Sequence, residues 1–63
     1  MRTIARNISY NKACMILESN GYKVTHVKHI AAEHSKRIRF NIFYNGEEKI
    51  ARFNEITGTL QVR

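Results

Sequence analysis

The 63-residue sequence predicts a small α+β domain in which one N-terminal helix packs on an antiparallel sheet of three to four strands. Three observations support this fold class: apolar side chains at helical spacing over residues 10–20, strict apolar alternation over residues 37–44, and an Asn45-Gly46 pair directly after that alternation. A chain of this length holds one domain. We therefore expect a single domain over residues 1–63, with residues 1–8 as a basic N-terminal arm or a short strand.

The predicted helix covers residues 10–20. Ser9 is a suitable N-cap, because its hydroxyl can accept a backbone N–H from the first turn. The apolar side chains that follow recur at i, i+3, i+4 and i+7, and they are Tyr10, Ala13, Cys14 and Leu17. Asn20-Gly21 then supplies the left-handed conformation at which helices commonly end. These features predict one apolar helix face that packs on the sheet.

The rest of the sequence indicates strands and turns. Residues 23–30 predict either a strand with a bulge or a short strand, because apolar residues recur there every three positions instead of every two. Residues 31–36 predict a polar loop. The alternation after this loop places four apolar side chains on one face of a half-buried strand: Ile38, Phe40, Ile42 and Tyr44. A second turn over residues 54–58 leads to a short last strand that contains Leu60 and Val62.

The turn after the alternating strand determines which residues face each other across the hairpin. A two-residue type I′ turn at Asn45-Gly46 sets Arg39 opposite Arg52. A three-residue loop over residues 45–47 instead pairs Phe40 with Arg52 and moves Arg39 to the apolar face. The sequence leaves both registers open, and the position of the charged residues depends on which one forms.

Charge is the clearest compositional signal. Eleven Lys and Arg residues stand against five Glu residues, which gives a net charge of +6. This excess favours a polyanionic partner, either a nucleic acid or an acidic protein, although a charge of this size also serves solubility.

Guanidinium groups beside an exposed aromatic ring suit single-stranded RNA or DNA, which offers phosphates for charge contacts and bases for stacking. In the two-residue register, Arg37, Arg39, Arg52 and Phe43 share the outer face of the sheet. The predicted nucleic-acid-binding residues are Arg37, Arg39, Phe43, Arg52, Arg2, Arg6, Lys28 and Lys36. The alternative interpretation is a solvated sheet face whose apolar residues, Phe43 and Ile50, pack in a dimer interface.

The sequence supplies little for catalysis or metal binding. Cys14 lies on the apolar helix face, where a buried thiol is usually inert. It is the single cysteine of the sequence, so an intramolecular disulfide is excluded. On a strand, His26 and His29 point to opposite faces, while His34 lies in the predicted loop. We therefore expect no enzyme, no cofactor and no metal site.

The expected location is the cytoplasm, because no signal peptide is visible and no run reaches the roughly 18 apolar residues that a membrane span needs. We also expect a homodimer, because a small open sheet usually leaves an apolar face or an edge uncovered.

The order of features resembles the PepSY domain. The segments ISYNKACMILESNGYKVTHVKHI and RIRFNIFYNGEEKIARFNEITGTLQV carry the resemblance over residues 8–62. Ser9 and Ala13 match the positions that open the helix of that family. Asn54, Thr57 and Gly58 match its aspartate-x-x-threonine-glycine turn, with asparagine in place of aspartate. The resemblance implies a helix packed on an extended hairpin and a role in binding or inhibiting peptidases, with no catalytic residues.

Two classes of function follow from the sequence. The first is a small non-enzymatic protein that binds RNA or other single-stranded nucleic acid through a basic sheet face. The second is an antagonist or adaptor that binds and inhibits a host protein, such as an RNA-cutting toxin or another defence enzyme. The Ile-, Asn- and Lys-rich composition, which is typical of phages and mobile elements, favours the second class.

Overall fold

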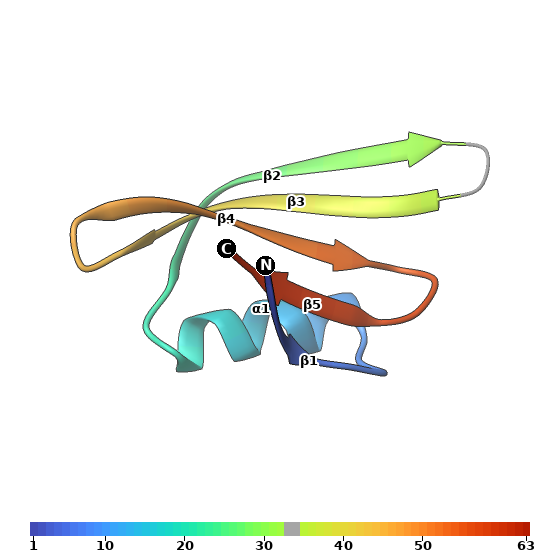
Figure 1. Ribbon diagram of the computed structural model, residues 1–63, viewed down its shortest axis with the longest axis horizontal. Coiled ribbons are helices and arrows are strands. Elements are labelled where there is room, and N and C mark those ends of the chain that lie inside the picture. Colours follow the sequence, from blue (N-terminus) through green and yellow to red (C-terminus); the bar gives the residue numbers. More distant parts are fainter. Residues whose placement is uncertain (33–34) are drawn as a thin grey trace.

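The computed structural model describes residues 1–32 and 35–63, and over these the chain folds as one helix on one face of an antiparallel sheet (Figure 1). The molecule is elongated, with extents of 35 × 19 × 19 Å. The elements in chain order are β1 (Arg2–Ala5), α1 (Tyr10–Ser19), β2 (Lys23–Ala32), β3 (Ser35–Tyr44), β4 (Glu47–Asn54) and β5 (Thr59–Val62). The α+β class predicted from the sequence is confirmed.

The sheet has five strands in the order β1-β5-β4-β3-β2, so the prediction of three to four strands is wrong. The additional strand is β1, which pairs with β5 through Arg2↔Val62 and Thr3↔Gln61. The expectation of an arm or a short strand over residues 1–8 is thus resolved as a strand over residues 2–5. Because β1 and β2 lie at opposite edges, α1 crosses the sheet behind β5 to connect them (Figure 1).

Helix α1 begins and ends where the capping residues require. The Ser9 hydroxyl accepts a hydrogen bond from the Lys12 backbone N–H at 3.2 Å. At the other end Asn20 is the C-cap, which makes the helix one residue shorter than predicted, and Gly21 takes a positive φ of 85°. The Tyr22 N–H then bonds to the Leu17 carbonyl at 3.0 Å. Together these bonds satisfy end groups that the helix itself leaves unpaired.

The core lies between α1 and the sheet. Its buried side chains are Ala13, Leu17, Ile38, Phe40, Ile42, Ala51, Phe53, Leu60 and Val62. Among residues 1–30 and 36–63, no polar or charged residue is buried. Tyr10 packs at the margin of the core. The pKa of its phenol is raised mainly by burial and, to a smaller extent, by the neighbouring Cys14 thiol.

The helix that the structure describes is not long and apolar enough to cross a bilayer.

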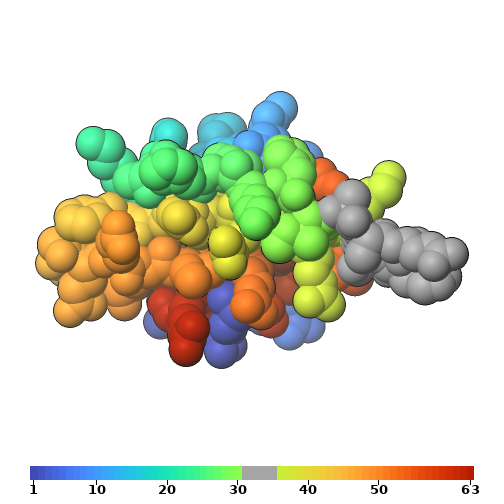
Figure 2. Space-filling model, turned by 90° about the horizontal axis from the view of Figure 1, so that it is seen from above, coloured from blue at the N-terminus to red at the C-terminus, as the bar shows by residue number. Residues whose placement is uncertain are grey.

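The β2–β3 hairpin is longer than predicted. Residues 31–32 and 35–36, expected in a polar loop, belong to the two strands, while the remainder of that loop, residues 33–34, lies outside the described residues. An antiparallel ladder satisfies backbone groups whatever the side chains are, so polar residues can extend it. Of the two alternatives that the sequence leaves open for residues 23–30, the bulge forms, between Val24 and His26, and the strand is not short. Figure 2 looks onto the sheet from the side of β2, so the green residues of this edge strand lie at the front of the view.

Of the two registers that the sequence leaves open, the β3–β4 turn has the one with a two-residue turn. Asn45 and Gly46 have φ angles of 50° and 79°, as a type I′ turn requires. Arg39 therefore lies opposite Arg52 and Ile38 opposite Phe53, and the three-residue alternative does not form.

The β4–β5 turn is held by an asparagine and a glycine. The Asn54 side-chain oxygen accepts hydrogen bonds from the backbone N–H groups of Ile56 at 2.9 Å and Thr57 at 3.2 Å. Gly58 has a φ of 68°, and a Cβ there would lie 2.7 Å from the backbone N and O of Ile8. Only glycine fits this contact, which joins the turn to the segment that enters α1.

Candidate nucleic-acid interface

The sheet face opposite α1, which we call the open face, carries a line of cations across its strands. Lys28 pairs with Arg39, and Arg39 pairs with Arg52. Arg52 in turn pairs with Gln61 of β5, and Gln61 with Thr3 of β1. Antiparallel partners point to the same face, so these side chains lie side by side across all five strands. We call Lys28, Arg39 and Arg52 the basic row.

Arg39, at the centre of the basic row, is half-buried, and its Nε is buried without a hydrogen-bond partner. An unsatisfied buried donor costs about 1–3 kcal/mol, and like charges directly opposite each other add to that cost. A bound anion would lower both the cost of the unsatisfied donor and the repulsion between the cations.

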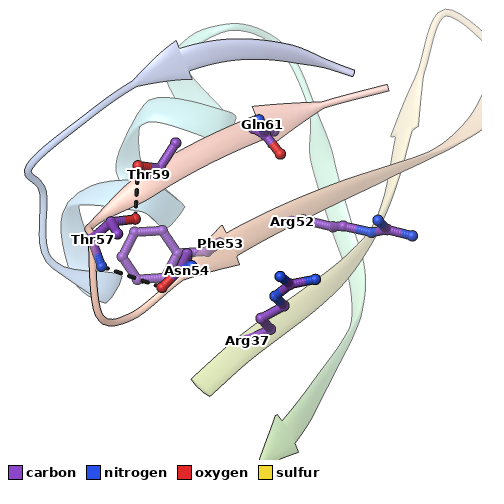
Figure 3. Close-up of a pocket in the computed structure, with 7 residues that line it drawn as sticks. All are labelled: Arg37, Arg52, Phe53, Asn54, Thr57, Thr59 and Gln61. Carbon is purple, nitrogen blue, oxygen red and sulfur yellow. Dashed lines mark hydrogen bonds between the residues drawn. The ribbon is translucent and has the colours of Figure 1, made fainter. Parts of the chain in front are cut away.

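Two adjoining hollows lie beside this row. The first has a volume of about 240 Å³ and is lined by Ile30, Arg37, Ile38, Arg39 and Arg52. The second, of about 220 Å³, lies toward β5 and is lined by Arg37, Arg52, Phe53, Asn54, Thr57, Thr59 and Gln61. Arg37 and Arg52 belong to both. Figure 3 shows these two side chains on neighbouring strands, with Asn54, Thr59 and Gln61 to one side of them.

The other end of the open face is aromatic. Phe43 is 41% exposed and pairs with Lys23 on one side and Glu48 on the other. Phe43 lies four residues along β3 from Arg39, a separation of about 13 Å. Among the described strand residues, Glu48 is the one carboxylate that the register brings to this face. The face therefore grades from cationic at one end to aromatic at the other.

Five of the eight predicted binding residues share the open face: Arg37, Arg39, Phe43, Arg52 and Lys28. The structure does not bring the other three together with them. Lys36 lies two residues before Ile38 on β3, and so points to the helix side. Arg2 lines a hollow with Tyr22 and Val62 on that same side. Arg6 follows the end of β1 and is exposed.

The sequence interpretation missed the polar residues that extend the basic row toward the sheet edge: Asn54, Thr59 and Gln61. It placed the last strand without a register against β4. A signal was present, because a tight turn over residues 55–58 sets Asn54 opposite Thr59, and hence Arg52 opposite Gln61.

The histidines do not assemble into a site. His26 pairs with Asn41 on the open face, while His29 pairs with Ile38 on the helix side, as strand alternation predicted. The His29 ring lies 6.2 Å from that of Tyr10. His34 is outside the described residues. Among the residues that the structure does describe, no three His, Cys, Asp or Glu side chains are grouped so as to hold a metal ion.

Comparison with known proteins adds no relative, because no family model, no curated protein and no solved structure matches this chain.

Proposed function

We propose that this protein is a small non-enzymatic module that binds RNA or other single-stranded nucleic acid on its open face. One observation carries the proposal: three cations stand side by side across the sheet, and the central one, Arg39, has a buried Nε with no acceptor. Like charges in this arrangement destabilise the protein alone and are relieved by a polyanion.

A single strand fits the open face better than a duplex does. The face is a sheet surface that offers phosphate contacts along the basic row and an exposed ring at Phe43. Unpaired bases stack on aromatic side chains, whereas bases inside a duplex are not available to do so. Sheet platforms with exposed aromatics are a common means of RNA recognition. No cofactor is needed for this role.

The first test measures the binding of labelled single-stranded RNA and of duplex DNA at 50 and 200 mM salt. Contact with about four phosphates lowers the affinity on the order of thirtyfold over this range. Binding at micromolar concentration or tighter, with this salt dependence and with preference for the single strand, would support the proposal. An absence of binding at 50 mM salt would refute it.

Charge reversal locates the interface. The double variant Arg39→Glu/Arg52→Glu should abolish binding and keep the fold, because both side chains stand on the face that α1 leaves open. The matched control is Lys12→Glu/Lys36→Glu, which changes the net charge equally on the helix side. Glu at position 12 also completes a capping box with Ser9, so the helix is not weakened. Equal loss of affinity in both variants would show that only net charge matters.

A second candidate function, the antagonist of an acidic host protein, is favoured by apolar side chains that stand among the cations. Ile30 is 43% exposed and Phe43 41% exposed on the open face. Protein interfaces commonly combine aromatic and Arg residues in this way. A pull-down that retains one protein after nuclease treatment would favour this function, and loss of the partner on nuclease treatment would favour nucleic acid.

We further propose a homodimer that forms through the β2 edge. β2 pairs only with β3, and Val27 on this strand is 41% exposed. An unpaired edge of this length is a template for a second strand. Light scattering after size exclusion should give twice the mass of one chain, and the mass of a single chain would contradict the dimer.

A further inference from the structure

The hollow of about 220 Å³ at the β4–β5 end of the open face has the composition of an anion site. Two guanidinium groups, those of Arg37 and Arg52, stand on its β3–β4 side (Figure 3). Apart from Phe53, its other lining residues are neutral and polar, from the end of β4, from the β4–β5 turn and from β5, and no carboxylate lines it. The hollow near the opposite end of the face is lined by Asn41, Glu48, Lys49 and Ile50 and so includes an acid.

The hydrogen bonds around this hollow leave donors free. The Asn54 oxygen is occupied by the N–H groups of Ile56 and Thr57, so the orientation of the amide is fixed and its NH₂ group remains available. The Thr57 hydroxyl donates to the Thr59 hydroxyl oxygen at 2.8 Å, which leaves the Thr59 hydrogen free to donate in its turn. The site therefore offers two charged donors and two neutral ones.

The position of the hollow decides which phosphate fits it. The turn over residues 55–58 bounds the hollow, and it brings a carboxylate, Glu55, to that end of the sheet. A polynucleotide lying on the basic row can continue along the sheet toward Phe43, where Glu48 is the one carboxylate among the described strand residues. At the turn, by contrast, the paired strands β4 and β5 end and Glu55 adds a negative charge. A terminal phosphate monoester carries about −1.5 to −2 charges and three terminal oxygens, which match two guanidinium groups better than the single charge of an internal phosphodiester does.

We propose that this hollow is a subsite for the terminal phosphate of the single-stranded nucleic acid, so that the end of the strand sits at Asn54 and Thr59 and the strand runs toward Phe43. The inference rests on the proposed function. The shared chemistry is a phosphate monoester, and it can come from either a 5′ or a 3′ end.

The first experiment probes the subsite without nucleic acid. Inorganic phosphate is titrated into ¹⁵N-labelled protein, and backbone amide shifts are followed. The amides of residues 54–61 should move in a saturable way, and this movement should be lost in Arg37→Gln and Thr59→Val. Lys36→Gln, which removes the same charge from the neighbouring residue on the helix side, should respond as the unaltered protein does. The absence of saturable shifts in this segment, or their retention in Arg37→Gln, would overturn the subsite.

The second experiment identifies the source of the phosphate. Three RNA strands of one sequence are compared, carrying a 5′-phosphate, a 3′-phosphate or two hydroxyl ends. One phosphorylated strand should bind about tenfold more tightly than the hydroxyl strand, the effect of one additional charge-assisted contact. This preference should disappear in Arg37→Gln and remain in Lys36→Gln. Equal affinity for all three strands would overturn the terminal subsite while the proposed function stands, whereas no binding of any strand would overturn both.

Discussion

The two faces of the sheet are made by the same strands but differ in composition: one is apolar and covered by α1, and the other is cationic and open. On β3 the side chains that point to α1 are Ile38, Phe40 and Ile42, and all three are buried. Those that point away include Arg37 and Arg39, and Arg39 stands between two other cations, Lys28 and Arg52. The helix-covered face gains free energy from apolar burial, whereas the open face retains an unfavourable charge arrangement. Stability and binding are therefore separated by strand alternation, and substitutions on the two faces should have separable effects.

The largest predicted effect compares two phenylalanines on β3. Phe40 is 0% exposed, so Phe40→Ala should lower the free energy of unfolding by about 3–5 kcal/mol, through lost burial and the cavity that remains. Phe43 is 41% exposed on the open face, and Phe43→Ala should leave the urea midpoint nearly unchanged while weakening RNA binding by about 1–3 kcal/mol through lost stacking. Urea unfolding and anisotropy measure the two quantities. A large loss of stability in Phe43→Ala would show that the faces are not independent.

The next comparison concerns the glycines of two turns. A Cβ at Gly58 would lie 2.7 Å from the Ile8 backbone, so Gly58→Ala should disturb the entry to α1 and destabilise the helix-covered face by more than about 1–3 kcal/mol, the cost of backbone strain alone.

Gly46 is the matched control, because its φ of 79° is similar and a Cβ there meets nothing within 4 Å. Gly46→Ala should therefore show only the cost of the positive φ, which is within the same range of about 1–3 kcal/mol. Thermal unfolding of both variants tests the difference. Equal melting temperatures would mean that the contact with Ile8 does not limit the turn.

The smallest predicted effect is an increase in stability, whereas the preceding substitutions lower stability or leave it nearly unchanged. Arg52→Gln removes one of two like charges that face each other across β3 and β4, and should raise the free energy of unfolding by on the order of a few tenths of a kcal/mol. The same substitution should weaken nucleic-acid binding. Chemical denaturation at low and high salt measures the gain, which should shrink as salt screens the repulsion. A net loss of stability would show that Arg52 has a structural role on the open face.

The parts of the fold that were predicted correctly are those governed by local chemistry. Ser9 and Asn20-Gly21 set the two ends of the helix, and Asn45-Gly46 provides the two-residue turn that was one of the two expected registers, because each acts through residues close in the sequence. The strand β1 was uncertain, because its pairing with β5 joins opposite ends of the chain and leaves no pattern within four residues.

The same distinction explains the candidate site. Arg37, Arg39 and Arg52 could be grouped because one turn fixes β3 against β4. Gln61 and Thr59 could not be added without the register of β5. Arg2 is predicted as a binding residue without a face, because only its pairing with Val62 decides that it lies on the helix side.

The pairing of β1 with β5 also has a consequence for biosynthesis. The hydrogen bond from Gln61 to Thr3 spans 58 positions of the sequence, so β1 waits for its partner strand until nearly the whole domain has been translated. Leu60 and Val62, which complete the core against α1, are made equally late. While translation proceeds, the apolar side of α1 has no finished sheet to cover it. Completion of the sheet and of the core is therefore a late event, which waits until β5 has left the ribosomal tunnel.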